Sequence, residues 1–216
     1  DGWSAANCTD WTSYVAGVAA FLRQRGARID GFDMLVQSDV PIGGGLSSSA
    51  ALEVATALAL SALANVTLPE VELADLCRAA EHQFAGVPCG IMDQYVSILA
   101  QAECALLLDC RARTWEHIPL VLGEHVLLVV DSGVRHELVG GEYARRQRQC
   151  QQAVEHFQRG NPAVRALRDV APQTLQRNAA ELDSIIAARA RHVITENDRT
   201  LAAAQALRHG NLAELG

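Results

Sequence analysis

Lysine is absent from the 216-residue sequence, so all eighteen basic residues are arginines. A phosphate loop of the Gly-Lys-Ser/Thr type, in which the lysine reaches the terminal phosphates, is therefore excluded. The net charge of -7 and the scattered arginines argue against a nucleic-acid-binding surface. The only basic cluster, Arg145, Arg146 and Arg148, is interpreted as a solvated helix face, with a phosphate contact as the alternative.

The six cysteines form no Cys-x-x-Cys pair and have no histidine at metal-binding spacing. Several of them lie in apolar runs, which predicts reduced thiols and a cytoplasmic location. We expect neither a signal peptide nor a membrane span, because the apolar run 50–64 is too short to cross a bilayer and is interrupted by Glu53. The sequence does not begin with methionine, and we expect it to be part of a longer protein.

The composition, 50% hydrophobic and 20% charged, suits one large globular domain or two small ones. Apolar spacing and turn residues divide the chain into short elements. Helices are predicted at 11–25, 52–64, 71–84, 95–100, 142–159, 175–182, 185–198 and 201–209, strands at 29–40, 104–109 and 125–131, and a polar, turn-like segment at 111–119.

The segment Pro41–Ala51 joins a predicted strand to a predicted helix and contains three consecutive glycines and three consecutive serines. Glycines allow a tight turn and a close backbone approach, and the first turn of a helix has N–H groups without intrahelical partners. Such a corner predicts an anion site, above all for phosphate. The alternative is an ordinary glycine loop capped by a serine. A Rossmann loop is excluded because the spacing is not Gly-x-Gly-x-x-Gly.

Two acidic residues near helix ends indicate chemistry. Glu81 lies near the C-terminal end of its predicted helix, where a carboxylate is disfavoured, and this suggests a compensating metal ion. Asp93 follows a Gly/Pro turn and lies near the start of the next helix, whose positive end suits a carboxylate that accepts a hydroxyl proton. The alternatives are a surface glutamate and a helix-capping aspartate.

The segment Pro41–Ala50 resembles, without a gap, the motif Pro-x-Gly-x-Gly-Leu-Ser-Ser-Ser-Ala of the GHMP kinases. Residues 80–94 resemble the galactokinases within that superfamily, through Glu-His and Cys-Gly-x-x-Asp-Gln. A Val-Arg-His segment followed by Glu-Tyr and an arginine-rich helix is also similar to galactokinases. The resemblance implies an α+β GHMP kinase fold: a ribosomal protein S5 domain 2-like N-terminal domain, incomplete, in residues 1–130, and the start of an α+β C-terminal domain in residues 131–216.

The resemblance also implies roles for individual residues. Asp93 would be the catalytic base, Gly90, Asp93 and Tyr143 would contact the sugar, and Ser49 with Glu81 would hold Mg²⁺. ATP would be bound by Pro41, Gly43, Gly44, Gly45, Leu46, Ser47, Ser48, Ser49, Ala50 and Arg135.

The activity implied is transfer of the γ-phosphate of MgATP to the C1 hydroxyl of α-D-galactose by a monomer that binds no nucleic acid or membrane. An N-acetylgalactosamine kinase and a non-catalytic galactokinase-like sugar sensor are the alternatives. The family's N-terminal Gly-Glu-His-Thr-Asp-Tyr type segment and its C-terminal glycine-rich motif are not found in this sequence. The resemblance therefore leaves open whether the 216-residue chain is active alone.

Overall fold

The computed structural model describes residues 10–131, 133 and 141–215. The chain divides into two compact units, one within residues 1–117 and 123–139 and the other within residues 118–122 and 140–216.

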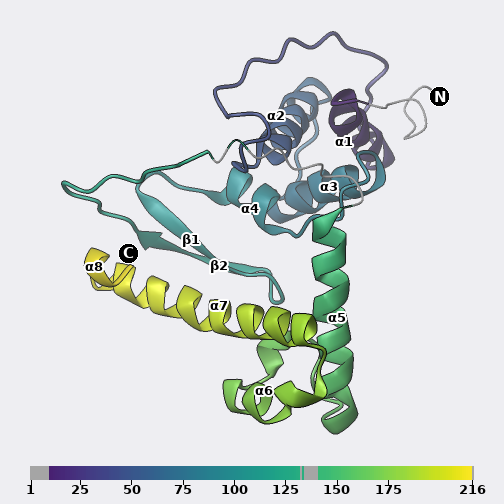
Figure 1. The fold of residues 1–216 in the computed structure, drawn as a ribbon. Helices are drawn as coiled ribbons and strands as arrows, with labels where there is room; N and C mark the ends of the chain where they lie inside the picture. Colours follow the sequence, from purple (N-terminus) through teal and green to yellow (C-terminus); the bar gives the residue numbers. More distant parts are fainter. Residues whose placement is uncertain (1–9, 132, 134–140, 216) are drawn as a thin grey trace. The chain divides into compact units, whose positions relative to one another are not determined.

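Four helices build the first unit: α1 (Thr12–Gln24), α2 (Ser48–Leu63), α3 (Glu70–Gln83) and α4 (Met92–Leu99). The helices α1, α2 and α3 pack against one another, and α4 packs against α2 and α3 (Figure 1). The crossing of α1 and α3 requires a glycine, because a Cβ atom at Gly17 would lie 2.9 Å from the Cβ of Ala80. The core between these helices is apolar and includes Val18, Leu22, Leu60 and Leu76.

A β-hairpin, formed by β1 (Cys104–Asp109) and β2 (Thr114–Pro119), follows the four helices. The Asp109 side chain fixes its turn by accepting hydrogen bonds from the backbone N–H groups of Arg111 and Ala112. Leu106 and Leu108 of β1 pack on Tyr95 and Leu99 of α4. The hairpin thus supports the helix that carries Asp93.

The second unit is almost entirely helical. Its elements are α5 (Glu142–Gly160), the 3-10 turns η2 (Leu167–Asp169) and η3 (Ala179–Glu181), and helices α6 (Pro172–Asn178), α7 (Ser184–Arg208) and α8 (Leu212–Leu215). A core that includes Val154, Phe157, Leu167 and Ile194 joins α5 and α7. Asp183 caps α7 by accepting hydrogen bonds from the N–H groups of Ile185 and Ile186.

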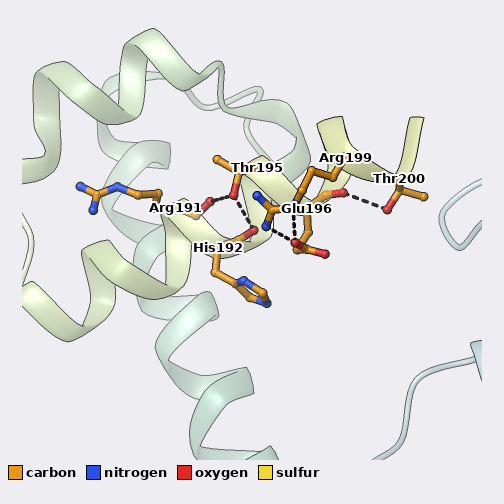
Figure 2. A network of polar contacts seen from close by, with 6 residues as sticks. All are labelled: Arg191, His192, Thr195, Glu196, Arg199 and Thr200. Atoms are coloured by element: carbon orange, nitrogen blue, oxygen red, sulfur yellow. Dashed lines mark hydrogen bonds and ion pairs between the residues drawn. The ribbon is translucent and has the colours of Figure 1, made fainter. Parts of the chain in front are cut away.

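The structure confirms the predicted helices around residues 11–25, 52–64, 71–84 and 142–159 and the strand 104–109, with small shifts at their ends. The prediction of two helices at 185–198 and 201–209 was wrong, because α7 is continuous. Figure 2 shows the polar contacts along this part of α7. The Thr195 and Thr200 hydroxyls donate to carbonyls of the preceding turn, Arg191 and Glu196, and Arg199 pairs with Glu196.

Three further predictions were wrong. The segment 111–119, predicted to be turn-like, contains β2. The runs 29–40 and 125–131, predicted as strands, lie in no sheet of the described structure. In 125–131 the large apolar side chains are exposed, with Val126 at 84%, whereas in 29–40 Leu35 is 98% exposed but Ile29 is buried. A strand needs a neighbour for its backbone groups, and the described residues provide none for these runs.

None of the five cysteines that the structure describes forms a disulfide, in agreement with the predicted thiols. Among the described helices, none combines the length and the apolar character that a membrane crossing requires.

Candidate active site

The glycine loop leads into α2 through a left-handed residue. Gly43 and Gly45 have φ of 71° and 77°, values that glycine adopts without strain, and Ser47, the N-cap residue, has φ of 56°. The Ser47 side chain makes no capping hydrogen bond. The interpretation of this segment as an ordinary serine-capped loop is therefore wrong for Ser47.

Glu81 is buried, with 3% of its surface exposed, so its interpretation as a surface glutamate is wrong. Ser49 Oγ donates to Glu81 Oε1 at 2.9 Å. The other carboxylate oxygen, Oε2, accepts from Gln94 Nε2 at 2.6 Å and from Cys89 Sγ at 3.1 Å. These contacts join the end of the glycine loop, the end of α3, and the turn and helix that contain Asp93 around one carboxylate.

A second carboxyl group, that of Glu53 on α2, lies close by and is fully buried. Gln94, also fully buried, donates from Nε2 to Glu53 Oε2 at 3.1 Å. Burial raises the pKa of Glu53 to about 9, and the negative charges of Glu81 and Asp93 add to this effect, against the hydrogen bond from Gln94, which lowers the pKa. Glu53 is therefore neutral at pH 7 in this structure.

The neutral Glu53 gives a pH-dependent stability. Between its ordinary pKa of 4.5 and about 9, Glu53 holds a proton in the folded protein but not in the unfolded chain. Its contribution to the free energy of unfolding is complete below pH 4.5 and is lost as pH rises through this window. Glutamine has no proton to lose, so this loss of stability is absent in Glu53→Gln. Without Mg²⁺ and nucleotide, the Tm of the variant should therefore rise relative to that of the wild type as pH increases. Thermal melts at several pH values test this, and a difference in Tm that is constant with pH would contradict it.

Asp93 is the second residue of α4 and is half-buried. The turn before it is held by His82, whose Nε2 lies 2.7 Å from the carbonyl oxygen of Cys89. A carbonyl only accepts, so Nε2 of His82 carries the proton and donates it. Burial, together with Glu81, raises the pKa of the Cys89 thiol, which stays protonated and can donate to that carboxylate. Both contacts fix the turn from which α4 starts.

Ser49 and Glu81 supply oxygen ligands, which Mg²⁺ prefers. Within the described part of the chain, no group of three or more His, Cys, Asp and Glu side chains forms a metal-binding cluster. This donor set still fits Mg²⁺, which usually takes one or two carboxylates from the protein and completes its shell with water and substrate phosphates. It does not fit Zn²⁺, which takes three or four protein ligands.

The structure places the other predicted residues as follows. In the loop, Pro41, Gly43, Gly45 and Leu46 are exposed, Gly44, Ser47 and Ser48 are half-buried, and Ala50 is buried. Gly90 is exposed in the turn before α4. Tyr143 belongs to the second unit, in the first turn of α5, with 54% of its surface exposed. Arg135 lies outside the described residues. The residues that the structure brings together are thus the loop serines, Glu81 and the start of α4.

Four residues of this site had no role in the sequence-based prediction: Glu53, His82, Cys89 and Gln94. Glu53 did carry a signal, since it is a charged residue in an otherwise apolar helix and lies one helical turn after Ser49. Gln94 was visible only as the last residue of a motif.

An open cavity of about 650 Å³ lies in the second unit, lined by residues that include His156, Phe157, Asp169 and Glu181. It contains none of the residues predicted to bind nucleotide, metal or sugar. The candidate active site is therefore the corner of the first unit described above.

Comparison with known proteins gives three results. Residues 13–101 match the family model of the GHMP kinases N terminal domain. Over 206 residues, 95% of the chain, the sequence is 45% identical to a galactokinase of Chloroflexus aurantiacus and 40% identical to one of Thermotoga maritima. The crystal structure of Lactococcus lactis galactokinase complexed with galactose superposes with a TM-score of 0.85 over 97% of the chain, at 29% identity. The chain spans about half the length of these relatives: 53%, 56% and 55%, respectively.

Proposed function

This chain carries a GHMP kinase N-terminal domain and is a homologue of the galactokinases, and from this we propose that the full-length protein is a galactokinase. It transfers the γ-phosphate of MgATP to the C1 hydroxyl of α-D-galactose and releases galactose 1-phosphate. The observation that carries the proposal is the hydrogen bond between the half-buried Ser49, at the end of the glycine loop, and the buried Glu81. It brings two side-chain oxygens together at the N-terminus of α2, which supports the proposal that Ser49 and Glu81 bind Mg²⁺.

The phosphates of ATP are bound at the residues of the loop, Pro41 to Ala50, with Arg135 as a further contact. The N–H groups of the first turn of α2 and the glycine backbone provide donors for anionic oxygens. Ser49 and Glu81 would hold Mg²⁺, which would supply positive charge next to the phosphates. Phosphoryl transfer depends mostly on positioning and on charge stabilisation, so a loop, one metal ion and one carboxylate suffice for much of it.

The acceptor side of the reaction is assigned to Asp93, Gly90 and Tyr143. Asp93 accepts the proton of the C1 hydroxyl or orients it, while Gly90 and Tyr143 contact the sugar. The solved relative was crystallised with galactose, which favours this sugar for the acceptor site. We also propose that residues 1–130 belong to the N-terminal domain and residues 131–216 to the start of the C-terminal domain. The monomeric state and the cytoplasmic location remain predictions.

A sugar sensor without catalysis is the alternative from a different class. Ser47, Ser48, Ser49 and Asp93 are all present, and Ser49 contacts Glu81 as a metal site needs. These residues favour the enzyme.

A substrate panel tests the proposal. We expect the full-length protein to consume ATP with galactose, and not with N-acetylgalactosamine, homoserine or mevalonate. The 216-residue chain is assayed in parallel. If the protein turns over N-acetylgalactosamine and none of the other acceptors, the assignment of galactose as the substrate is wrong and the protein is an N-acetylgalactosamine kinase. If the protein binds nucleotide in a galactose-dependent way but turns over none of the acceptors, the sensor hypothesis would replace the enzyme hypothesis.

A further inference from the structure

The three parts of the proposed site come from three different helices. The loop serines enter α2, Glu81 ends α3, and Asp93 starts α4. Phosphoryl transfer needs such groups held in a fixed arrangement, because small displacements cost large factors in rate. One side chain of this chain contacts carboxyl groups on two of these helices and stands on the third.

That side chain is Gln94, the residue after Asp93. Its amide nitrogen has two hydrogens, and two carboxyl groups accept from it, Glu81 Oε2 at 2.6 Å and Glu53 Oε2 at 3.1 Å. The donor capacity of the amide is thus divided between α3 and α2. All three side chains are at least 97% buried, so water does not compete for these hydrogen bonds.

The Glu81 carboxylate is oriented by these contacts. Ser49 donates to one of its oxygens, and Gln94 and Cys89 donate to the other. Hydrogen bonds to both oxygens fix the plane of the carboxylate. Partners of metal-binding carboxylates that fix the ligand orientation affect metal affinity by about 10- to 100-fold when they are removed. Glu53 acts one step further out, as the second acceptor that anchors the Gln94 amide.

We infer that Gln94, anchored by Glu53, is a positioning residue that orients the Glu81 carboxylate for the metal and holds the helix of Asp93 to the two helices that carry Ser49 and Glu81. This inference deepens the proposed function and rests on its assignment of Ser49 and Glu81 to Mg²⁺. Gln94 itself is fully buried, so it acts through Glu81 and the position of α4 and not by contact with a substrate.

The test uses the full-length protein and measures, by calorimetry, the Kd of a non-hydrolysable ATP analogue with Mg²⁺ and with EDTA. The ratio of the two values gives the gain in affinity due to Mg²⁺. Gln94→Leu has a similar volume but no donor, and we expect this gain to fall about 10-fold or more while the Kd in EDTA stays within about 2-fold of wild type. Gln101→Leu, the same change at an exposed position after α4, should keep the wild-type gain.

Three further variants separate positioning from stability. Glu53→Gln keeps a carbonyl acceptor for Gln94 and should retain most of the gain, whereas Glu53→Leu should lose part of it. In Gln94→Leu/Glu53→Leu both polar partners are apolar, so stability should recover relative to the single variants. The Mg²⁺ gain should not recover, because Glu81 still lacks its donor. If the gain in affinity due to Mg²⁺ rises and falls with Tm across the four variants, the inference is overturned, because Gln94 would then act through stability alone.

Galactose turnover of the wild type is measured separately, with ATP and Mg²⁺, on the same protein preparation. If Gln94→Leu folds and keeps the wild-type Mg²⁺ gain, the inference fails and the proposed function stands. If the wild type shows the gain and loses it on Gln94→Leu but phosphorylates no galactose, the inference stands and the proposed function fails. If Gln94→Leu does not fold, the Mg²⁺ gain of Glu53→Leu is compared with that of Glu53→Gln. A lower gain in Glu53→Leu supports the inference, and equal gains overturn it.

Discussion

Asp93→Ala in the full-length protein is expected to lower kcat for galactose phosphorylation by about 10²- to 10⁴-fold, the range that a positioned general base contributes. Asp93 stands in the first turn of α4, behind a turn fixed by His82 and Cys89, and Gln94 anchors the helix on its buried side. The carboxylate is half-buried and is therefore accessible to a substrate. Its loss removes the acceptor of the hydroxyl proton and leaves the phosphate loop intact.

The measurement is steady-state turnover together with the Kd of the ATP analogue in the presence of Mg²⁺. Nucleotide affinity should change little, because the proposed function assigns Asp93 to the acceptor side. Asp93→Asn is the matched variant: it keeps the shape and removes the proton acceptor, so it should be about as slow as Asp93→Ala. Turnover equal to wild type in either variant would show that Asp93 is not the base.

Glu81→Ala is expected to lower the affinity for the Mg²⁺–nucleotide complex by roughly 100-fold or more, since loss of a ligand should cost at least as much as loss of its orienting partner. It removes the acceptor of three donors, Ser49, Cys89 and Gln94, which then lie near an apolar methyl group. Each buried polar group left without a partner costs about 1–3 kcal/mol, so the free energy of unfolding should fall as well.

Glu81→Gln separates the two effects. Its side-chain oxygen still accepts from a donor, so stability should fall less than in Glu81→Ala, but the charge that attracts Mg²⁺ is gone. Glu70→Ala, an exposed glutamate at the start of the same helix, is the control for loss of one negative charge. Calorimetry with Mg²⁺ and with EDTA measures the effect. Unchanged Mg²⁺ dependence in Glu81→Gln would remove Glu81 from the metal site.

Local signals predicted the helices of the first unit. The glycine loop before α2 and the Gly/Pro turn before α4 placed Ser49 and Asp93 at helix starts, where the structure has them. Both positions depend on residues adjacent in sequence, so pattern alone suffices. The runs 29–40 and 125–131 have the composition of strands but lie in no described sheet, because strand formation depends on a partner that composition does not reveal.

The hydrogen bonds that join Glu53, Glu81 and Gln94 could not be predicted from the sequence. Glu81 begins a polar stretch, Glu-His-Gln, that is typical of a surface, and only the packing of α2 and α4 on α3 buries it. Glu53 was used only as an argument against a membrane span. Its neutral state follows from burial and from the charge of Glu81, a residue 28 positions further along the chain, and no periodicity of α2 alone predicts that.

The most direct test of the account is ³¹P NMR of the full-length protein incubated with ATP, Mg²⁺ and galactose. The account predicts the resonance of galactose 1-phosphate, growing as the γ-phosphate of ATP disappears, and its absence when Mg²⁺ is chelated or when Asp93 is replaced by alanine. ATP hydrolysis to free phosphate with no phosphosugar, or product formation by the Asp93→Ala variant at the wild-type rate, would contradict it.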